Sequence, residues 1–195
     1  MARRSDHTRA ELKQLALESA RKIVREQGVS ALSTRKLAKE IGYTSGTLYQ
    51  IFKNRDDLGD QLNIETVKQL FEFCKDIPID RPPDELLRSL AENFVTFASS
   101  HSSEWDAVIN YPFTPDYQPS EAYNGWIEKL MGLIHTCTNE LYGTEAQDLQ
   151  RRDAQLLWHS LYGIFALASA GRISRNRTIA EMVDDLIEMF LAARM

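Results

Sequence analysis

Cysteine is scarce in this chain of 195 residues, which contains only Cys74 and Cys137. The two are far apart in the sequence and form no CxxC pair, which argues against a disulfide framework and against a zinc site. We expect both to be small buried hydrophobic residues. Apolar and charged residues occur in ordinary proportions, so the chain can bury a core without such cross-links.

Long apolar runs are also missing. No apolar stretch reaches the roughly 18 residues that a membrane-spanning helix needs, and the longest candidate, residues 156–170, is interrupted by polar residues. The first 14 residues are highly charged and lack the apolar segment of a signal peptide. We therefore expect a cytoplasmic protein with no membrane partner.

Catalytic signatures are absent from the sequence, including GxSxG, HExxH and the P-loop. His101 and Glu104 have the i,i+3 spacing of some metal sites, but no further ligands accompany them. We expect no enzyme activity, no metal and no cofactor. A helical enzyme is kept as an alternative.

Strand-like alternation is lacking too, and apolar residues recur at helical spacing almost throughout, which predicts an all-α protein. Glycines at 28 and 171 are suited to end helices, and three prolines between 111 and 119 require a loop. Capping boxes at Thr144–Gln147 and Thr178–Glu181 predict the starts of the last two helices. The other long helices are expected at residues 8–27, 56–77, 84–100 and 120–141, and a shorter one at residues 104–110.

Charge is distributed unevenly along the chain. Residues 1–55 carry 12 Lys and Arg against 5 Asp and Glu, a formal charge of +7, whereas residues 56–195 carry −12. A basic N-terminal segment, residues 1–55, followed by an acidic one, residues 56–195, suggests that the basic segment binds a polyanion. The alternative is an ordinary solvated basic helix surface.

The segment 34–51 has the spacing of a helix-turn-helix motif. Two helices that meet at a steep angle need apolar residues where they touch, and a small Ala38 lets them approach closely. Gly42 stands where the turn requires a positive φ, Ser33 can cap the first helix, and Thr44 or Ser45 the second. An ordinary helical hairpin is the alternative. The predicted contact residues are Leu37, Ile41, Leu48 and Ile51.

The stretch Leu32–Leu58 resembles the DNA-binding signature of the TetR family of regulators. A long helix precedes the motif, Thr47-Leu48-Tyr49 closes it, and a basic turn leads into a fourth helix. That turn ends in Arg55, where the family usually has Lys. The resemblance implies a three-helix DNA-binding domain over residues 1–55, joined through helix four to a larger helical ligand-binding and dimerisation domain over residues 56–195.

The resemblance also implies roles for individual residues in binding duplex DNA at a palindromic operator. Arg35 matches a position that reads a base edge or grips phosphate, and Ser45, Gly46 and Thr47 match positions that face bases. Tyr49 and Arg55 match residues that bind phosphate; for Tyr49, a core aromatic is the alternative. The predicted DNA-binding set is Ser33, Thr34, Arg35, Thr44, Ser45, Gly46, Thr47, Tyr49, Gln50, Lys53 and Arg55.

Residues 56–195 include many aromatic residues on helices that surround a ligand cavity in the family, so we expect an unidentified small-molecule effector. Trp158 to Gly171 resembles a family subgroup marked by Trp and Leu-His-Gly, with Tyr162 in place of the His. Plain helical core is the alternative for each aromatic. The predicted ligand-binding residues are Phe94, Phe97, Trp105, Trp126, Leu130, Trp158 and Tyr162.

The last two helices are apolar on more than one side, which predicts burial in a four-helix dimer interface, as in the family. The expected function is a homodimeric repressor that a small molecule releases from its operator. The alternative is a DNA-binding regulator whose body binds a protein partner and no small molecule. The predicted interface residues are Gly163, Ala166, Ala170, Val183, Leu186, Ile187 and Phe190.

Overall fold

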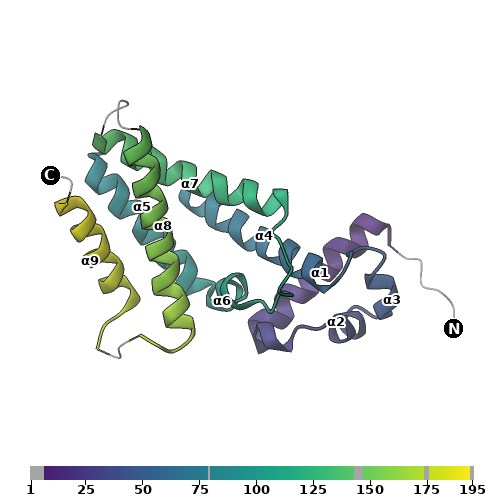
Figure 1. The fold of residues 1–195 in the computed structure, drawn as a ribbon. Helices are drawn as coiled ribbons and strands as arrows, with labels where there is room; N and C mark the ends of the chain where they lie inside the picture. The colour runs from purple at the N-terminus through teal and green to yellow at the C-terminus, as the bar shows by residue number, and fades with distance from the viewer. Residues whose placement is uncertain (1–6, 79, 143–146, 174–175, 194–195) are drawn as a thin grey trace. The chain divides into compact units, whose positions relative to one another are not determined.

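The computed structural model describes residues 7–78, 80–142, 147–173 and 176–193, and every regular element in these ranges is helical (Figure 1). The all-α prediction is confirmed. A short 3-10 helix, η1 (Val29–Ala31), lies between the first two α-helices. The α-helices in these ranges are α1 (Arg9–Gln27), α2 (Thr34–Glu40), α3 (Ser45–Leu48), α4 (Arg55–Cys74), α5 (Pro83–Ser100), α6 (Ser102–Asn110), α7 (Glu121–Tyr142), α8 (Gln147–Ser169) and α9 (Ile179–Ala192).

Capping boxes begin the first and the last helix. The Thr8 side chain accepts a hydrogen bond from the Glu11 backbone N–H, and the Glu11 carboxylate accepts one from the Thr8 backbone N–H. These hydrogen bonds lower the pKa of Glu11 below its ordinary value. Thr178 and Glu181 make the same pair at the start of α9, as predicted. The box predicted at Thr144–Gln147 lies largely outside the described residues, since only Gln147 is described.

The chain forms two compact units, one of residues 1–66 and 102–123 and the other of residues 67–101 and 124–195. This division differs from the expected domain boundary after residue 55. The first part of α4 and all of α6 pack with α1 to α3, because their apolar residues complete the core of that unit. In the described residues, no helix is long and apolar enough to cross a membrane.

The first unit has its own hydrophobic core beneath the helix-turn-helix motif. Apolar residues of α1, α2, α3 and α4 meet there with Ala107 and Tyr111, which come from α6 and the segment after it. The buried Glu104 carboxylate pairs with Arg25 and so ties α6 to the end of α1. The largest fully buried side chains of this core are those of Val24, Leu37, Leu48, Leu58 and Leu62.

The second unit is built from the remaining part of α4, from α5 and from α7 to α9. Helix α9 packs on both α5 and α8. Aromatic rings join α5 to α8, since Phe94 meets Trp158 and Phe165 edge-to-face at centroid distances of 6.1 and 5.0 Å. These residues lie outside the hydrophobic core of the first unit.

Candidate functional site

The helix-turn-helix motif has the predicted local geometry. Helices α2 and α3 pack together through Leu37 and Leu48, both almost fully buried. Gly42 lies in the turn with φ of +75°, a left-handed conformation that suits glycine, and Tyr43 N donates to Ala38 O at 2.9 Å. The short α3 is thereby held against α2 by one buried leucine and a tight turn.

Side-chain caps define where both motif helices start. Ser33 Oγ accepts from the Lys36 backbone N–H at 3.2 Å, and Thr44 Oγ1 accepts from the Thr47 backbone N–H at 3.2 Å. The Thr44 and Thr47 hydroxyls lie 3.0 Å apart. A hydroxyl that accepts from a backbone N–H can still donate its own proton, so a capping role is compatible with binding a phosphate oxygen.

All the predicted DNA-binding residues reach the surface. Three of them, Thr34, Ser45 and Thr47, are partly exposed, and the other eight are exposed. The Tyr49 side chain, directly after α3, is 55% exposed, so it is not a core aromatic of this chain. Residues 33–55 therefore present hydroxyl, amide and cationic side chains at the surface. These are the groups that contact phosphates and base edges.

The N-terminus of α4 carries a network that the sequence analysis missed. Asn54 Oδ1 accepts from the Asp57 backbone N–H at 2.8 Å, while Asp57 Oδ2 accepts from the Lys53 backbone N–H at 2.7 Å. This reciprocal arrangement fixes the turn that presents Lys53 and Arg55. The Asn at 54 and the Asp three positions later were the available signal, since Asn favours N-cap positions. Helix N-termini attract anions, which suits a phosphate at this end of α4.

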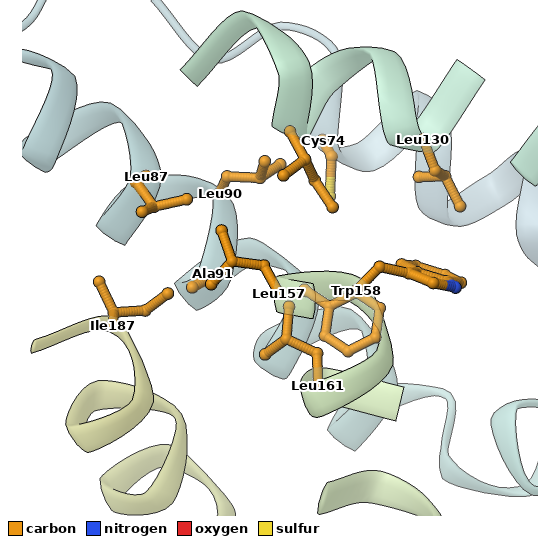
Figure 2. Close-up of a pocket in the computed structure, with 11 residues that line it drawn as sticks. Cys74, Leu87, Leu90, Ala91, Leu130, Leu157, Trp158, Leu161 and Ile187 are labelled. Carbon is orange, nitrogen blue, oxygen red and sulfur yellow. The ribbon is translucent and has the colours of Figure 1, made fainter. Parts of the chain in front are cut away.

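A small apolar cavity lies inside the second unit (Figure 2). Its volume is about 30 Å³, the space of roughly one water molecule. Within the described residues, the space that this wall lines is therefore too small for the expected ligand. Burial raises the pKa of the Cys74 thiol in its wall to about 12. The wall is formed by Cys74, Leu87, Leu90, Ala91, Phe94, Leu130, Ile134, Leu157, Trp158, Leu161 and Ile187.

Three of the seven predicted ligand residues, Phe94, Leu130 and Trp158, line this cavity. Tyr162 is not among the lining residues; its ring centroid lies 6.5 Å from that of Trp158, and burial raises its pKa. The other three are elsewhere: Phe97 stacks on His101, Trp126 packs against Phe71, and Trp105 belongs to the first unit.

The predicted dimer residues divide into two groups. Val183 and Ile187 are each 1% exposed and face the chain's own core, because α9 turns this side toward the rest of its unit. Ala170 is exposed, and Gly163, Ala166, Leu186 and Phe190 are partly exposed. Apolar residues that the prediction omitted extend this outer surface, namely Leu156 and Leu167 on α8 and Met189 on α9, which is 72% exposed.

Two family models match the chain. The model described as bacterial regulatory proteins of the tetR family matches residues 16–62, and the model described as the tetracyclin repressor-like C-terminal domain matches residues 87–190, more than half of the chain. Together with the motif geometry, these matches define a helix-turn-helix transcriptional regulator. The chain belongs to the TetR family. Members of this family are DNA-binding regulators and not enzymes, so the enzyme alternative is set aside.

Individual relatives agree with this assignment. A relative from Haemophilus influenzae, described as an uncharacterized HTH-type transcriptional regulator, is 26% identical over 98 residues, about half the length of either protein. A solved structure of a protein with unknown function from Rhodococcus sp. RHA1 covers 99% of both chains, with 20% identity and a TM-score of 0.70. A TetR transcriptional regulator from the same organism covers 94% of this chain and 98% of its own, with 14% identity and a TM-score of 0.70. These structures share the fold of this chain.

Proposed function

We propose that this regulator binds a palindromic operator as a homodimer and acts as a repressor. The observation that carries the proposal is the surface around α3, where every predicted DNA-binding residue is exposed or partly exposed. Two recognition helices of a dimer then enter major grooves about 34–36 Å apart. Sequence selection from random duplexes tests this, because a dimer selects two inverted half-sites at a fixed spacing.

In this proposal the contacts divide between phosphates and bases. Tyr49, Lys53 and Arg55 bind phosphate oxygens, and Arg35 with the first turn of α3 reads base edges. The recognition helix contributes no Arg or Asn, which leaves few groups for bidentate base contacts. Specificity therefore depends on Arg35, Gln50 and the shape of the operator.

We expect Arg55→Ala to weaken binding to operator and unrelated duplexes alike. Each phosphate contact releases counterions, so the slope of log affinity against log salt concentration should fall in magnitude by about one per half-site. Lys75→Ala is the matched control, since Lys75 is an exposed cation just beyond the other end of α4. A changed sequence preference at an unchanged salt slope would contradict the phosphate role.

We further propose that an apolar small molecule releases the operator by enlarging the cavity of the second unit. The support is the wall itself, whose polar groups are limited to the Cys74 thiol and the Trp158 indole N–H. Ligand pockets commonly measure about 300–1,000 Å³, so the ligand must separate helices that are closed here. A ligand shifts the equilibrium only through its different affinities for the closed and the enlarged state.

Trp158 offers a direct test of this regulation. In a Trp105→Phe/Trp126→Phe variant, we expect an effective apolar compound to change Trp158 emission over the same concentration range in which it releases operator. A Trp105→Phe/Trp158→Phe variant is the control, because Trp126 packs outside the cavity wall. Release of operator with unchanged Trp158 emission would place the ligand elsewhere. If no compound in an apolar panel acts, regulation through a protein partner is the better interpretation.

A further inference from the structure

An aromatic segment after α6, residues 111–120, is hydrogen-bonded to the first turns of α4 within the first unit. The Asp56 carboxylate accepts from Thr114 N at 3.3 Å and from Thr114 Oγ1 at 2.5 Å. One turn further along α4, Asp60 Oδ1 accepts from the Tyr117 hydroxyl and from Ser120 N. Both carboxylates are buried, so these hydrogen bonds are shielded from water.

Tyr111, at the start of this segment, lies against the N-terminal end of α4. Its hydroxyl donates to the Arg55 backbone carbonyl at 2.8 Å, and the Arg55 guanidinium carbon lies 5.7 Å from the centre of its ring. The ring packs against Phe113, with centroids 4.6 Å apart, and Phe113 stacks on Tyr117 at 3.8 Å. The Tyr111 ring near Arg55 is therefore itself held by a second aromatic ring.

Gly59 makes room for this ring. A Cβ atom at position 59 would lie 2.7 Å from Tyr111 Cδ1 and closer still to Cε1 and Cζ. Glycine inside a helix lowers helix stability by roughly 1 kcal/mol relative to alanine. The close approach of Tyr111 is a physical reason for a glycine in the second turn of α4.

We propose that Tyr111, seated on Gly59, is a positioning residue that orients Arg55 toward the operator phosphate. An arginine side chain loses considerable rotamer entropy when it is fixed, and an aromatic face beneath the guanidinium restricts it before DNA arrives. The hydrogen bond to the Arg55 carbonyl fixes the backbone at the same residue. This inference rests on the proposed phosphate role of Arg55.

The test measures operator affinity and its salt dependence in Gly59→Ala and in Tyr111→Phe. We expect Gly59→Ala to lower affinity about tenfold and to reduce the magnitude of the salt slope by about one per half-site, as Arg55→Ala does. Tyr111→Phe keeps the ring and loses only the hydroxyl, so a drop of about threefold is expected. Gly125→Ala is the matched control, because its added Cβ meets no atom within 4 Å in α7.

The same substitutions in an Arg55→Ala background separate positioning from a general loss of folding. If Tyr111 acts through Arg55, neither Gly59→Ala nor Tyr111→Phe lowers affinity further in that background. If either substitution lowers operator affinity in that background by the same factor as in the chain with Arg55, its effect does not act through Arg55 and the inference is wrong. If circular dichroism shows that Gly59→Ala does not fold, the test rests on Tyr111→Phe measured with Arg55 and in the Arg55→Ala background. An unchanged salt slope in Arg55→Ala alone would instead refute the phosphate role itself.

Discussion

Leu186→Asp is expected to convert the proposed dimer into monomers and to lower operator affinity by at least about a hundredfold. Leu186 is partly exposed on α9, three residues before Met189, which is 72% exposed. In the proposed four-helix interface, a carboxylate there is buried without a partner, which costs several kcal/mol. A monomer binds one half-site only, and the loss of the second half-site contact lowers operator affinity by a factor of about 10²–10⁴.

Light scattering and operator titration together check this prediction. Asp184→Lys serves as the control, because it reverses a charge on the exposed polar face of α9 and should leave both the mass and the affinity unchanged. Circular dichroism establishes that the Leu186→Asp variant is folded. A folded variant that keeps the dimer mass would show that α9 does not form the interface.

The helices were predictable because their signals are local. Thr8, Ser33 and Thr178 are side-chain caps in the structure, and Gly28 and Gly171 end helices with positive φ. Caps and left-handed glycines depend on backbone groups a few residues away, so one sequence is enough to place them.

The surface of the DNA-binding motif was also predictable in its main features. The spacing of Leu37 and Leu48 fixes which sides of α2 and α3 face inward, so polar residues between them must face outward. The Asn54 cap was overlooked although its pattern is local. The residues of the motif thus follow from periodicity, whereas their roles rest on the family resemblance.

Long-range packing was beyond this reasoning. Periodicity shows that α9 is apolar but not which part of its circumference meets α5 and α8, so Val183 and Ile187 were assigned to the wrong side. Aromatic content likewise does not reveal a cavity volume, because the same rings can enclose a ligand or close on each other. The contact of Tyr111 with Gly59 joins positions 52 residues apart, and no local pattern signals it.

Leu48→Ala is expected to abolish specific operator binding while the second unit stays folded. Leu48 is the buried residue of α3 and is 1% exposed. A four-residue helix has no stability of its own, so its position depends on this side chain. Truncating a buried leucine costs about 2–5 kcal/mol, a large share of the total of about 5–15 kcal/mol for a domain.

The loss should be local because α3 belongs to one compact unit and α8 and α9 belong to the other. Hydrogen exchange is expected to rise in residues 34–52 and to stay unchanged in α8 and α9, while light scattering still reports a dimer. Leu133→Ala makes the same chemical change at a partly exposed position of α7 and should leave operator affinity within about twofold. If Leu48→Ala binds operator as tightly as the unaltered chain, α3 is not the element that reads DNA, because a recognition helix without its anchor cannot hold the register that base contacts require.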